Sequence, residues 1–224
     1  MSIEQARFNM VEQQIRPWDV LNQDVLALLF TVKREDFVSA AYRSLAFMDT
    51  EIPLNENGEH QFMLSPKLEA RILQEVAPKS HERVLEIGTG SGYFTALLAK
   101  SAERVASIEY FQTLATSAAA KLASADIGNV EITVGDAATS PAAFVPQQQK
   151  FEVIVFTGSL PTLPTAYLPY LAIGGRLFAV IGDAPAMKGT LITKIAEAAY
   201  NTSELFETVV PVLINAPQPS RFQF

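Results

Sequence analysis

Apolar residues recur at helical spacing in the first third of the chain. One set stands at positions i, i+3, i+4 and i+7 of a helix: Val25, Leu28, Leu29 and Val32. A second set with similar spacing comprises Leu68, Ile72 and Val76. Asn22 can cap the first predicted helix, and Ser65 followed by Pro66 suits the start of the second. We therefore predict a helical region over residues 1–78, with a polar loop at 49–60 between the two helices.

From about residue 82 onward, short apolar runs typical of β-strands alternate with helical stretches. The predicted strands cover 83–87, 104–108, 130–134, 151–156 and 176–181, and the predicted helices cover 94–100 and 112–123. This alternation predicts an α/β fold whose doubly wound, mostly parallel sheet carries helices on both faces. Two further β-rich runs, 191–195 and 205–213, are joined too closely for a crossover and predict an antiparallel pair at one edge. The sheet then has seven strands, in a domain covering residues 79–224.

Composition narrows the chemistry that this fold can carry. The chain has no cysteine and two histidines, so disulfides, thiol nucleophiles and cysteine-based zinc sites are excluded, and no metal site is expected. Acidic residues outnumber basic ones by 24 to 17, with no basic cluster, which argues against a nucleic-acid partner. An apolar run of membrane-spanning length and a signal-peptide pattern are both lacking. We therefore expect a cytoplasmic protein without a membrane partner.

A glycine-rich loop between the first predicted strand and the helix after it carries the clearest functional signal. The segment consists of Glu86, Ile87, Gly88, Thr89, Gly90, Ser91 and Gly92. Glycine lets the backbone turn sharply and approach a ligand closely, and ligands of open α/β sheets bind at this carboxyl edge. The dinucleotide pattern G-x-G-x-x-G is not met, because Tyr93 stands where its third glycine belongs. The alternative interpretation is a tight turn without a ligand.

Acidic residues follow the next two predicted strands. Glu109 comes at the end of the second strand, and Asp136 follows the third, directly before Ala137. A carboxylate at the end of the second strand can accept hydrogen bonds from both hydroxyl groups of a ribose. The alternatives are a solvated strand-end glutamate and an ordinary turn aspartate.

The G-x-G-x-G loop, with an acid two residues before its first glycine, resembles the first motif of class I S-adenosylmethionine-dependent methyltransferases. Further segments resemble the protein-L-isoaspartate O-methyltransferase family over most of the chain: 10–14, 33–38, 41–43, 49–54, 83–93, 157–164 and 174–177. The resemblance implies a Rossmann-like methyltransferase that binds S-adenosylmethionine through Glu86, residues 88–92, Glu109, Asp136 and Ala137. It places Asp136 beside the adenine amino group.

The resemblance also implies a reaction, the methylation of the free carboxylate of L-isoaspartyl residues in damaged proteins. A carboxylate is already a competent nucleophile at neutral pH, so the reaction needs no general base. The positive methyl donor and the negative acceptor neutralise each other during transfer, and a desolvated site favours that step. The protein's main task is then to align the reacting atoms.

One loop departs from the family pattern. The family reads Gly-Gln-Thr-Ile-Ser-Gln-Pro there, with an active-site serine, whereas this chain reads His60-Gln61-Phe62-Met63-Leu64-Ser65-Pro66. Gln61 matches, but Leu64 stands at the serine position. Gln61 and Ser65 are the candidate catalytic residues, Ser65 if the loop shifts by one residue, and a helix cap is the alternative role of Ser65. The acceptor is therefore an isoaspartyl protein or a more apolar small molecule, and a catalytically inactive cofactor-binding homologue is the third possibility.

Overall fold

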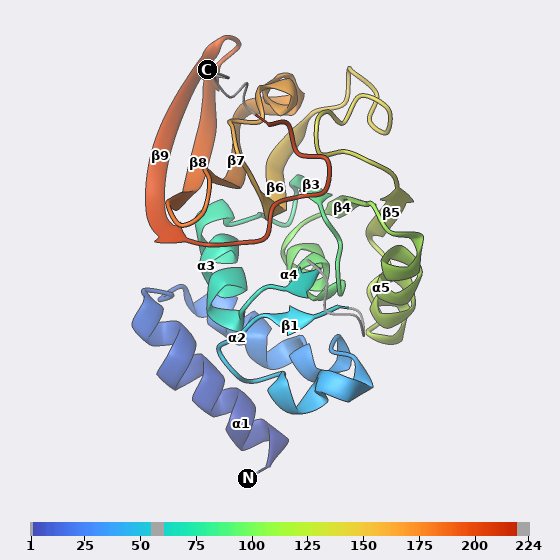
Figure 1. Ribbon diagram of the computed structural model, residues 1–224, viewed down its shortest axis with the longest axis vertical. Coiled ribbons are helices and arrows are strands. Elements are labelled where there is room, and N and C mark those ends of the chain that lie inside the picture. The colour runs from blue at the N-terminus through green and yellow to red at the C-terminus, as the bar shows by residue number, and fades with distance from the viewer. Residues whose placement is uncertain (1, 55–60, 219–224) are drawn as a thin grey trace, which may run out of the picture.

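The computed structural model describes residues 2–54 and 61–218, and a seven-stranded sheet forms its centre. The strand order is β5-β4-β3-β6-β7-β8-β9, which Figure 1 shows from right to left. The strands are β3 (Arg83–Ile87), β4 (Arg104–Glu109), β5 (Val130–Val134), β6 (Phe151–Leu160), β7 (Leu171–Ile181), β8 (Met187–Ala196) and β9 (Ala199–Thr208). β3 to β7 are parallel, and β8 and β9 add an antiparallel hairpin beside β7. The predicted fold class is confirmed.

Two strand boundaries differ from the prediction in ways that shape the site. β6 runs on to Leu160, because Ser159 and Leu160 still pair with Val180 and Ile181 of β7. The run predicted as a strand over 205–213 is wrong in its second half, since β9 ends at Thr208. Residues 209–213 leave the hairpin, and Val212 forms an isolated parallel bridge with Ser159 of β6. A proline at position 211 fits the break because proline has no N–H for a strand ladder.

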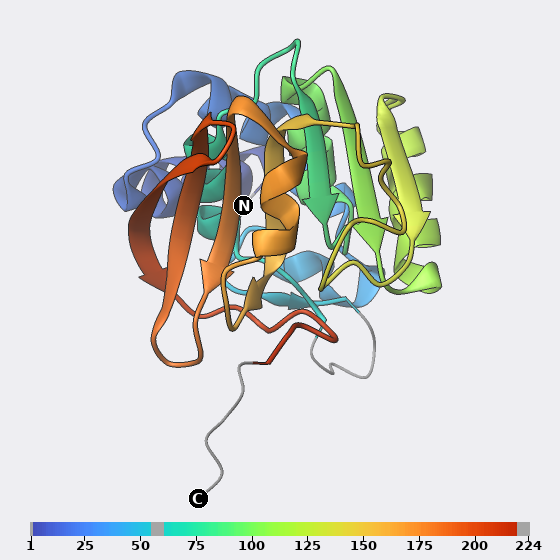
Figure 2. The ribbon, with the colours of Figure 1, turned by 90° about the horizontal axis from the view of Figure 1, so that it is seen from above.

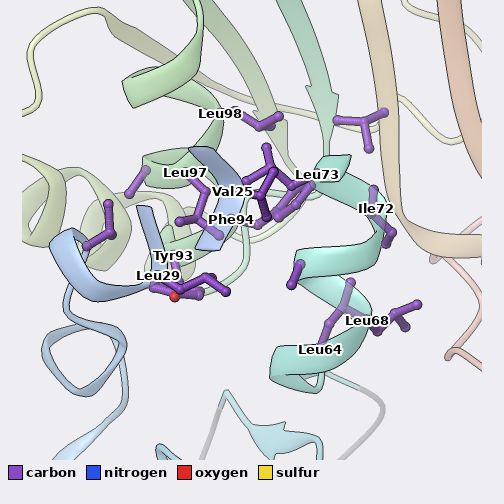
Figure 3. Close-up of a cluster of buried hydrophobic side chains, with 14 of the residues drawn as sticks. Val25, Leu29, Leu64, Leu68, Ile72, Leu73, Tyr93, Phe94, Leu97 and Leu98 are labelled. Carbon is purple, nitrogen blue, oxygen red and sulfur yellow. The ribbon is translucent and has the colours of Figure 1, made fainter. Parts of the chain in front are cut away.

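The α-helices beside the sheet gather on one of its faces (Figure 2). They are α2 (Gln23–Thr31), α3 (Pro66–Val76), α4 (Tyr93–Ser101) and α5 (Gln112–Ser124). Figure 3 shows Val25 of α2, Leu73 of α3 and Leu97 of α4 meeting in one buried apolar cluster. The predicted cap of α2 is confirmed, because the Asn22 Oδ1 atom accepts hydrogen bonds from the N–H groups of Asp24 and Val25 at 2.9 and 3.3 Å.

The N-terminal region packs against this helical layer. Its further elements are α1 (Ile3–Asn9), a π-helical segment η1 (Met10–Ile15), and the 3-10 helices η2 (Arg16–Trp18), η3 (Arg34–Asp36) and η4 (Ala40–Leu45). The predicted polar loop is wrong in part, because β1 (Ile52–Pro53) pairs with β2 (Phe62–Met63); residues 55–60 lie outside the described residues. The expected boundary between residues 78 and 79 falls in the turn between α3 and β3, and the buried cluster contains residues from both sides, among them Leu73 and Val84.

The opposite face of the sheet is covered differently from the first. A 3-10 helix, η5 (Thr165–Tyr170), and the irregular segment 138–150 lie against it. The rings of Phe156 and Tyr167 meet edge to face with their centroids 4.7 Å apart, inside a second buried cluster. Both faces of the sheet are therefore shielded, and the carboxyl ends of β3 to β6 open toward the loops.

Candidate active site

The glycine-rich loop after β3 is shaped for close approach. Gly88 and Gly90 have φ angles of 98° and 54°, in the left-handed region that favours glycine. A Cβ atom on Gly88 would lie 2.3 Å from the Thr157 Oγ1 atom, and one on Gly90 would lie 3.3 Å from a Leu54 methyl carbon. Gly92 has a φ angle of 84° and also allows close packing, because a Cβ atom there would lie 3.1 Å from the Ala118 Cβ atom of α5.

A cavity of about 770 Å³ lies over the carboxyl ends of the parallel strands. It is lined by Gly88 and Gly90 after β3, by Glu109 at the end of β4, and by Asp136 after β5. Residues 210–214 form a further wall. The structure therefore brings together the residues that the sequence placed at the ends of three separate strands.

Glu109 links the end of β4 to the glycine-rich loop. It is only 4% exposed, and its Oε2 atom accepts a hydrogen bond from the Gly90 N–H at 2.8 Å. Its Oε1 atom accepts one from the Phe111 N–H at 3.0 Å. Each carboxylate oxygen carries further lone pairs, so this group can still accept hydrogen bonds from two neighbouring hydroxyl groups in the cavity.

Asp136 and Ala137 form the wall after β5. The Asp136 Oδ1 atom accepts a hydrogen bond from the Ala138 N–H at 3.2 Å, and its Oδ2 atom accepts one from the Asn215 side-chain amide at 2.7 Å. Ala137 also lines the cavity, and its carbonyl oxygen accepts a hydrogen bond from the Tyr167 hydroxyl. This edge is thus held by contacts from two distant parts of the chain.

Glu86 lies beneath the loop and is not among the described residues that line the cavity. Its Oε2 atom accepts hydrogen bonds from the Ser107 and Thr95 hydroxyl groups, both at 2.6 Å, and Ser107 shares a further 2.6 Å hydrogen bond with Thr89. Complete burial raises the pKa of Glu86 to about 8. A protonated carboxyl group here ties β3, β4 and α4 to the loop.

Some residues of the segment at positions 61–65 line the cavity and others do not. Gln61, Phe62 and Leu64 line it, and the Leu64 carbonyl oxygen accepts a hydrogen bond from the Arg34 guanidinium at 2.7 Å. Ser65 occupies the N-cap position of α3, but its side chain makes no capping hydrogen bond, so that part of the cap interpretation is wrong. Ser65 is not among the described residues lining this cavity.

Two walls of the cavity were missed from the sequence. Thr157 and Gly158 lie in the unexpected extension of β6, and the Thr157 hydroxyl donates to the Gly88 carbonyl at 2.6 Å. The strap, residues 210–214, crosses the strand ends because the Ser159 N–H donates to the Pro211 carbonyl at 2.9 Å and the Leu213 N–H donates to the Ser159 carbonyl at 3.0 Å. Pro211 was the available signal, since a residue without an N–H interrupts the β-rich run there.

The described residues show neither a membrane-spanning helix nor a metal-binding cluster. Within residues 2–54 and 61–218, no helix is both long and apolar enough to span a membrane. The same part of the chain contains no group of three or more His, Cys, Asp or Glu side chains arranged to hold a metal ion.

Three features together are typical of the class I S-adenosylmethionine-dependent methyltransferases. These are a parallel sheet with an antiparallel hairpin at its edge, a glycine-rich loop after β3, and an acid at the end of β4. Comparison with known proteins narrows the class. The model of the protein-L-isoaspartate(D-aspartate) O-methyltransferase family matches residues 5–214. The chain belongs to this family, so the predictions of a methyltransferase enzyme and of S-adenosylmethionine as its cofactor are confirmed.

Individual relatives agree along most of the chain. A protein-L-isoaspartate O-methyltransferase of Rhodopseudomonas palustris is 37% identical over 226 residues, which cover 97% of this chain and 89% of the relative. One from Methanoculleus marisnigri is 36% identical over 79% of this chain and 77% of its own length. A crystal structure from Plasmodium falciparum, described as a protein-L-isoaspartate O-methyltransferase with S-adenosyl-L-homocysteine, superposes with a TM-score of 0.77 at 20% identity and covers 92% of this chain and 97% of its own. At that identity it supports the fold alone.

Proposed function

We propose that the chain transfers a methyl group from S-adenosylmethionine to the free carboxylate of L-isoaspartyl residues in peptides and proteins. The observation that carries this proposal is the cavity itself. Its walls bring Glu109 and the glycine-rich loop together with Gln61, Phe62 and Leu64. Family membership supplies the acceptor class.

The residues present fit the cofactor. Gly88 and Gly90 leave room where any Cβ atom would crowd the cavity wall, and the Glu109 carboxylate is held at the position suited to the ribose hydroxyl groups. Asp136 and Ala137 are proposed to lie beside the adenine. When bound, S-adenosylmethionine supplies a methyl group activated by a positively charged sulfur, and the described residues that line the cavity include no lysine or arginine.

The acceptor end of the cavity works by excluding water. Phe62 and Leu64 present apolar walls, which strengthen the attraction between an acceptor carboxylate and a positive sulfur. The carboxylate needs no general base, so the remaining task is alignment. Gln61 lines this end and is proposed to contact the acceptor; Ser65 is proposed as a catalytic hydroxyl only with a one-residue shift of its loop.

Radiolabelled methyl transfer to an isoaspartyl peptide, compared with its normal aspartyl twin, tests the proposal. We expect base-labile label on the isoaspartyl peptide and none on the twin. The absence of label on both, with S-adenosylhomocysteine still bound, would overturn the acceptor assignment.

The apolar lining at Phe62 and Leu64 favours a second candidate, a methyltransferase for a small apolar acceptor. Methylation of compounds in a metabolite extract, with the isoaspartyl peptide inert, is the outcome expected of that function. A protein that binds cofactor but labels neither substrate is the inactive homologue. A cytoplasmic location and the lack of nucleic-acid and membrane partners stay predictions.

A further inference from the structure

A second, smaller cavity of about 290 Å³ adjoins the main one behind the glycine-rich loop. The two share Phe62, Leu64, Gly88, Gly90 and Thr157 in their walls. The smaller one continues to Thr89, Ser91, Phe94 and Glu69. Glu69 is the one charged side chain among the described residues that line it.

Strand order shows which part of the cofactor reaches this place. With the adenine beside Asp136 after β5 and the ribose on Glu109 at the end of β4, the next strand in the sheet is β3. The chain of the cofactor that leads from the ribose through the sulfur to the amino acid group therefore extends over the loop after β3. The smaller cavity lies at that loop, so it is placed to receive the amino acid group.

Glu69 is held in one position by a buried arginine. Arg34 is fully buried, and its Nη1 atom binds the Glu69 Oε2 atom. Arg34 also donates to the main-chain carbonyls of Ala46 at 3.0 Å and Leu64 at 2.7 Å, which fixes the guanidinium. The carboxylate keeps a second oxygen with its own lone pairs, and a carboxylate oxygen is a strong partner for an ammonium group.

The charges around the loop favour a cation. Glu69 and Glu109 are both less than 5% exposed, and their negative charges add to the effect of burial in raising the pKa of the neighbouring Glu86. Arg34 offsets one of these carboxyl groups through its ion pair with Glu69. A ligand that brings a positive sulfur and an ammonium group therefore complements the carboxylates of Glu69 and Glu109, which line the two cavities.

We propose that Glu69 is a cofactor-binding residue that accepts a hydrogen bond from the α-ammonium group of the methionine moiety. Arg34 positions the carboxylate for this contact. The proposal rests on the cofactor half of the proposed function and is independent of the methyl acceptor.

Calorimetric titration with two ligands tests it: S-adenosylhomocysteine, and the analogue in which hydrogen replaces the α-amino group. Wild type should bind the analogue about tenfold more weakly or worse, since a hydrogen bond between charged groups is lost. Glu69→Gln should weaken S-adenosylhomocysteine by a similar factor and leave the analogue within about twofold of wild type. Glu35→Gln is the matched control, because Glu35 is buried and ion-paired with Arg7 but is absent from the described walls of both cavities.

Equal loss for both ligands in Glu69→Gln would overturn the proposal, because it would show a general effect on the cavity. If that variant does not fold, the wild-type comparison still decides, since equal affinity for the two ligands excludes an ammonium partner. Methyl transfer is not part of this measurement. A missing isoaspartyl activity beside a clear preference for the amino group would overturn the acceptor assignment alone.

Discussion

The Glu109 carboxylate accepts a hydrogen bond from the main-chain N–H of Gly90 at 2.8 Å. The acid at the end of β4 thereby fixes the loop that follows β3, and the two main sequence signals form one unit. A change at either residue is expected to disturb the other, so each needs a control that separates fold from binding.

Glu109→Ala should weaken S-adenosylhomocysteine binding by at least a hundredfold. The variant loses two hydrogen bonds to ribose hydroxyl groups, at about 1.5–3 kcal/mol each because one partner is charged. Calorimetric titration measures the change, and Glu131→Ala is the control, since Glu131 is exposed on β5. Unchanged affinity would remove Glu109 from the site.

Gly90→Val should abolish cofactor binding while the fold survives. A side chain at a φ of 54° is strained by about 1–2 kcal/mol, and its Cβ atom would press on Leu54 at 3.3 Å in the cavity wall. Gly174→Ala is the control for strain, because Gly174 has a φ of 81° with open space around it. Circular dichroism, thermal melting and S-adenosylhomocysteine titration separate the two effects. Normal binding by Gly90→Val would leave the glycine with a turn role only.

Leu64→Ser should raise isoaspartyl methylation above a weak wild-type rate. A hydroxyl group can hydrogen-bond the acceptor carboxylate for about 1.5–3 kcal/mol, or roughly one to two powers of ten in rate, whereas leucine cannot. Leu64 is 5% exposed, so the change also costs roughly 2–5 kcal/mol of stability. Leu68→Ser is the control, because it makes the same substitution at a similarly buried position that is not among the described residues lining the cavity. A drop in activity equal to that of Leu68→Ser would exclude a role for a hydroxyl at position 64.

Ser65→Ala should change stability by less than about 0.5 kcal/mol, because the serine side chain makes no capping hydrogen bond. Steady-state kinetics should also be unchanged. Denaturant titration and methyl-transfer assays check both statements. A folded but inactive variant would show that the loop shifts by one residue and that Ser65 is the functional hydroxyl.

Glu86→Gln should flatten the dependence of stability on pH. Burial raises the pKa of Glu86 from 4.5 to about 8, so the folded protein keeps a proton that the unfolded chain has lost. The stability from this group is complete below about pH 4.5 and is lost as the pH rises to about 8. Relative to wild type, the variant should gain about 5 kcal/mol of unfolding free energy across that range. Urea titrations at several pH values measure it, and parallel curves would contradict the raised pKa.

Local patterns were enough to predict the sheet. Each strand from β3 to β5 is a short apolar run. Asn22 indicates the start of α2, because its side chain accepts hydrogen bonds from the first turn of the helix. Gly88 and Glu109 could be placed at the site because parallel strands share one carboxyl edge. In these cases the information lies within a few residues of the feature.

Features that depend on distant contacts were not predictable. Glu69 looks like one polar residue on α3, and only the folded chain shows it against Arg34 and the smaller cavity. The hydrogen bonds that Glu86 accepts beneath the loop come from Ser107 and Thr95, which lie on other elements and could not be paired with it from the sequence. The wall at residues 210–214 depends on pairing with Ser159, which periodicity cannot reveal.

The walls of the main cavity come from segments as far apart as Leu54 and Ile214. Contacts between these walls therefore require long loops of the chain to close, and contacts between residues far apart in the sequence form slowly in folding. The main cavity is complete only when the strap, residues 210–214, is also in place. Tight binding of S-adenosylhomocysteine therefore reports that the complete native topology has formed. Partly folded chains that already have native-like secondary structure should not bind it.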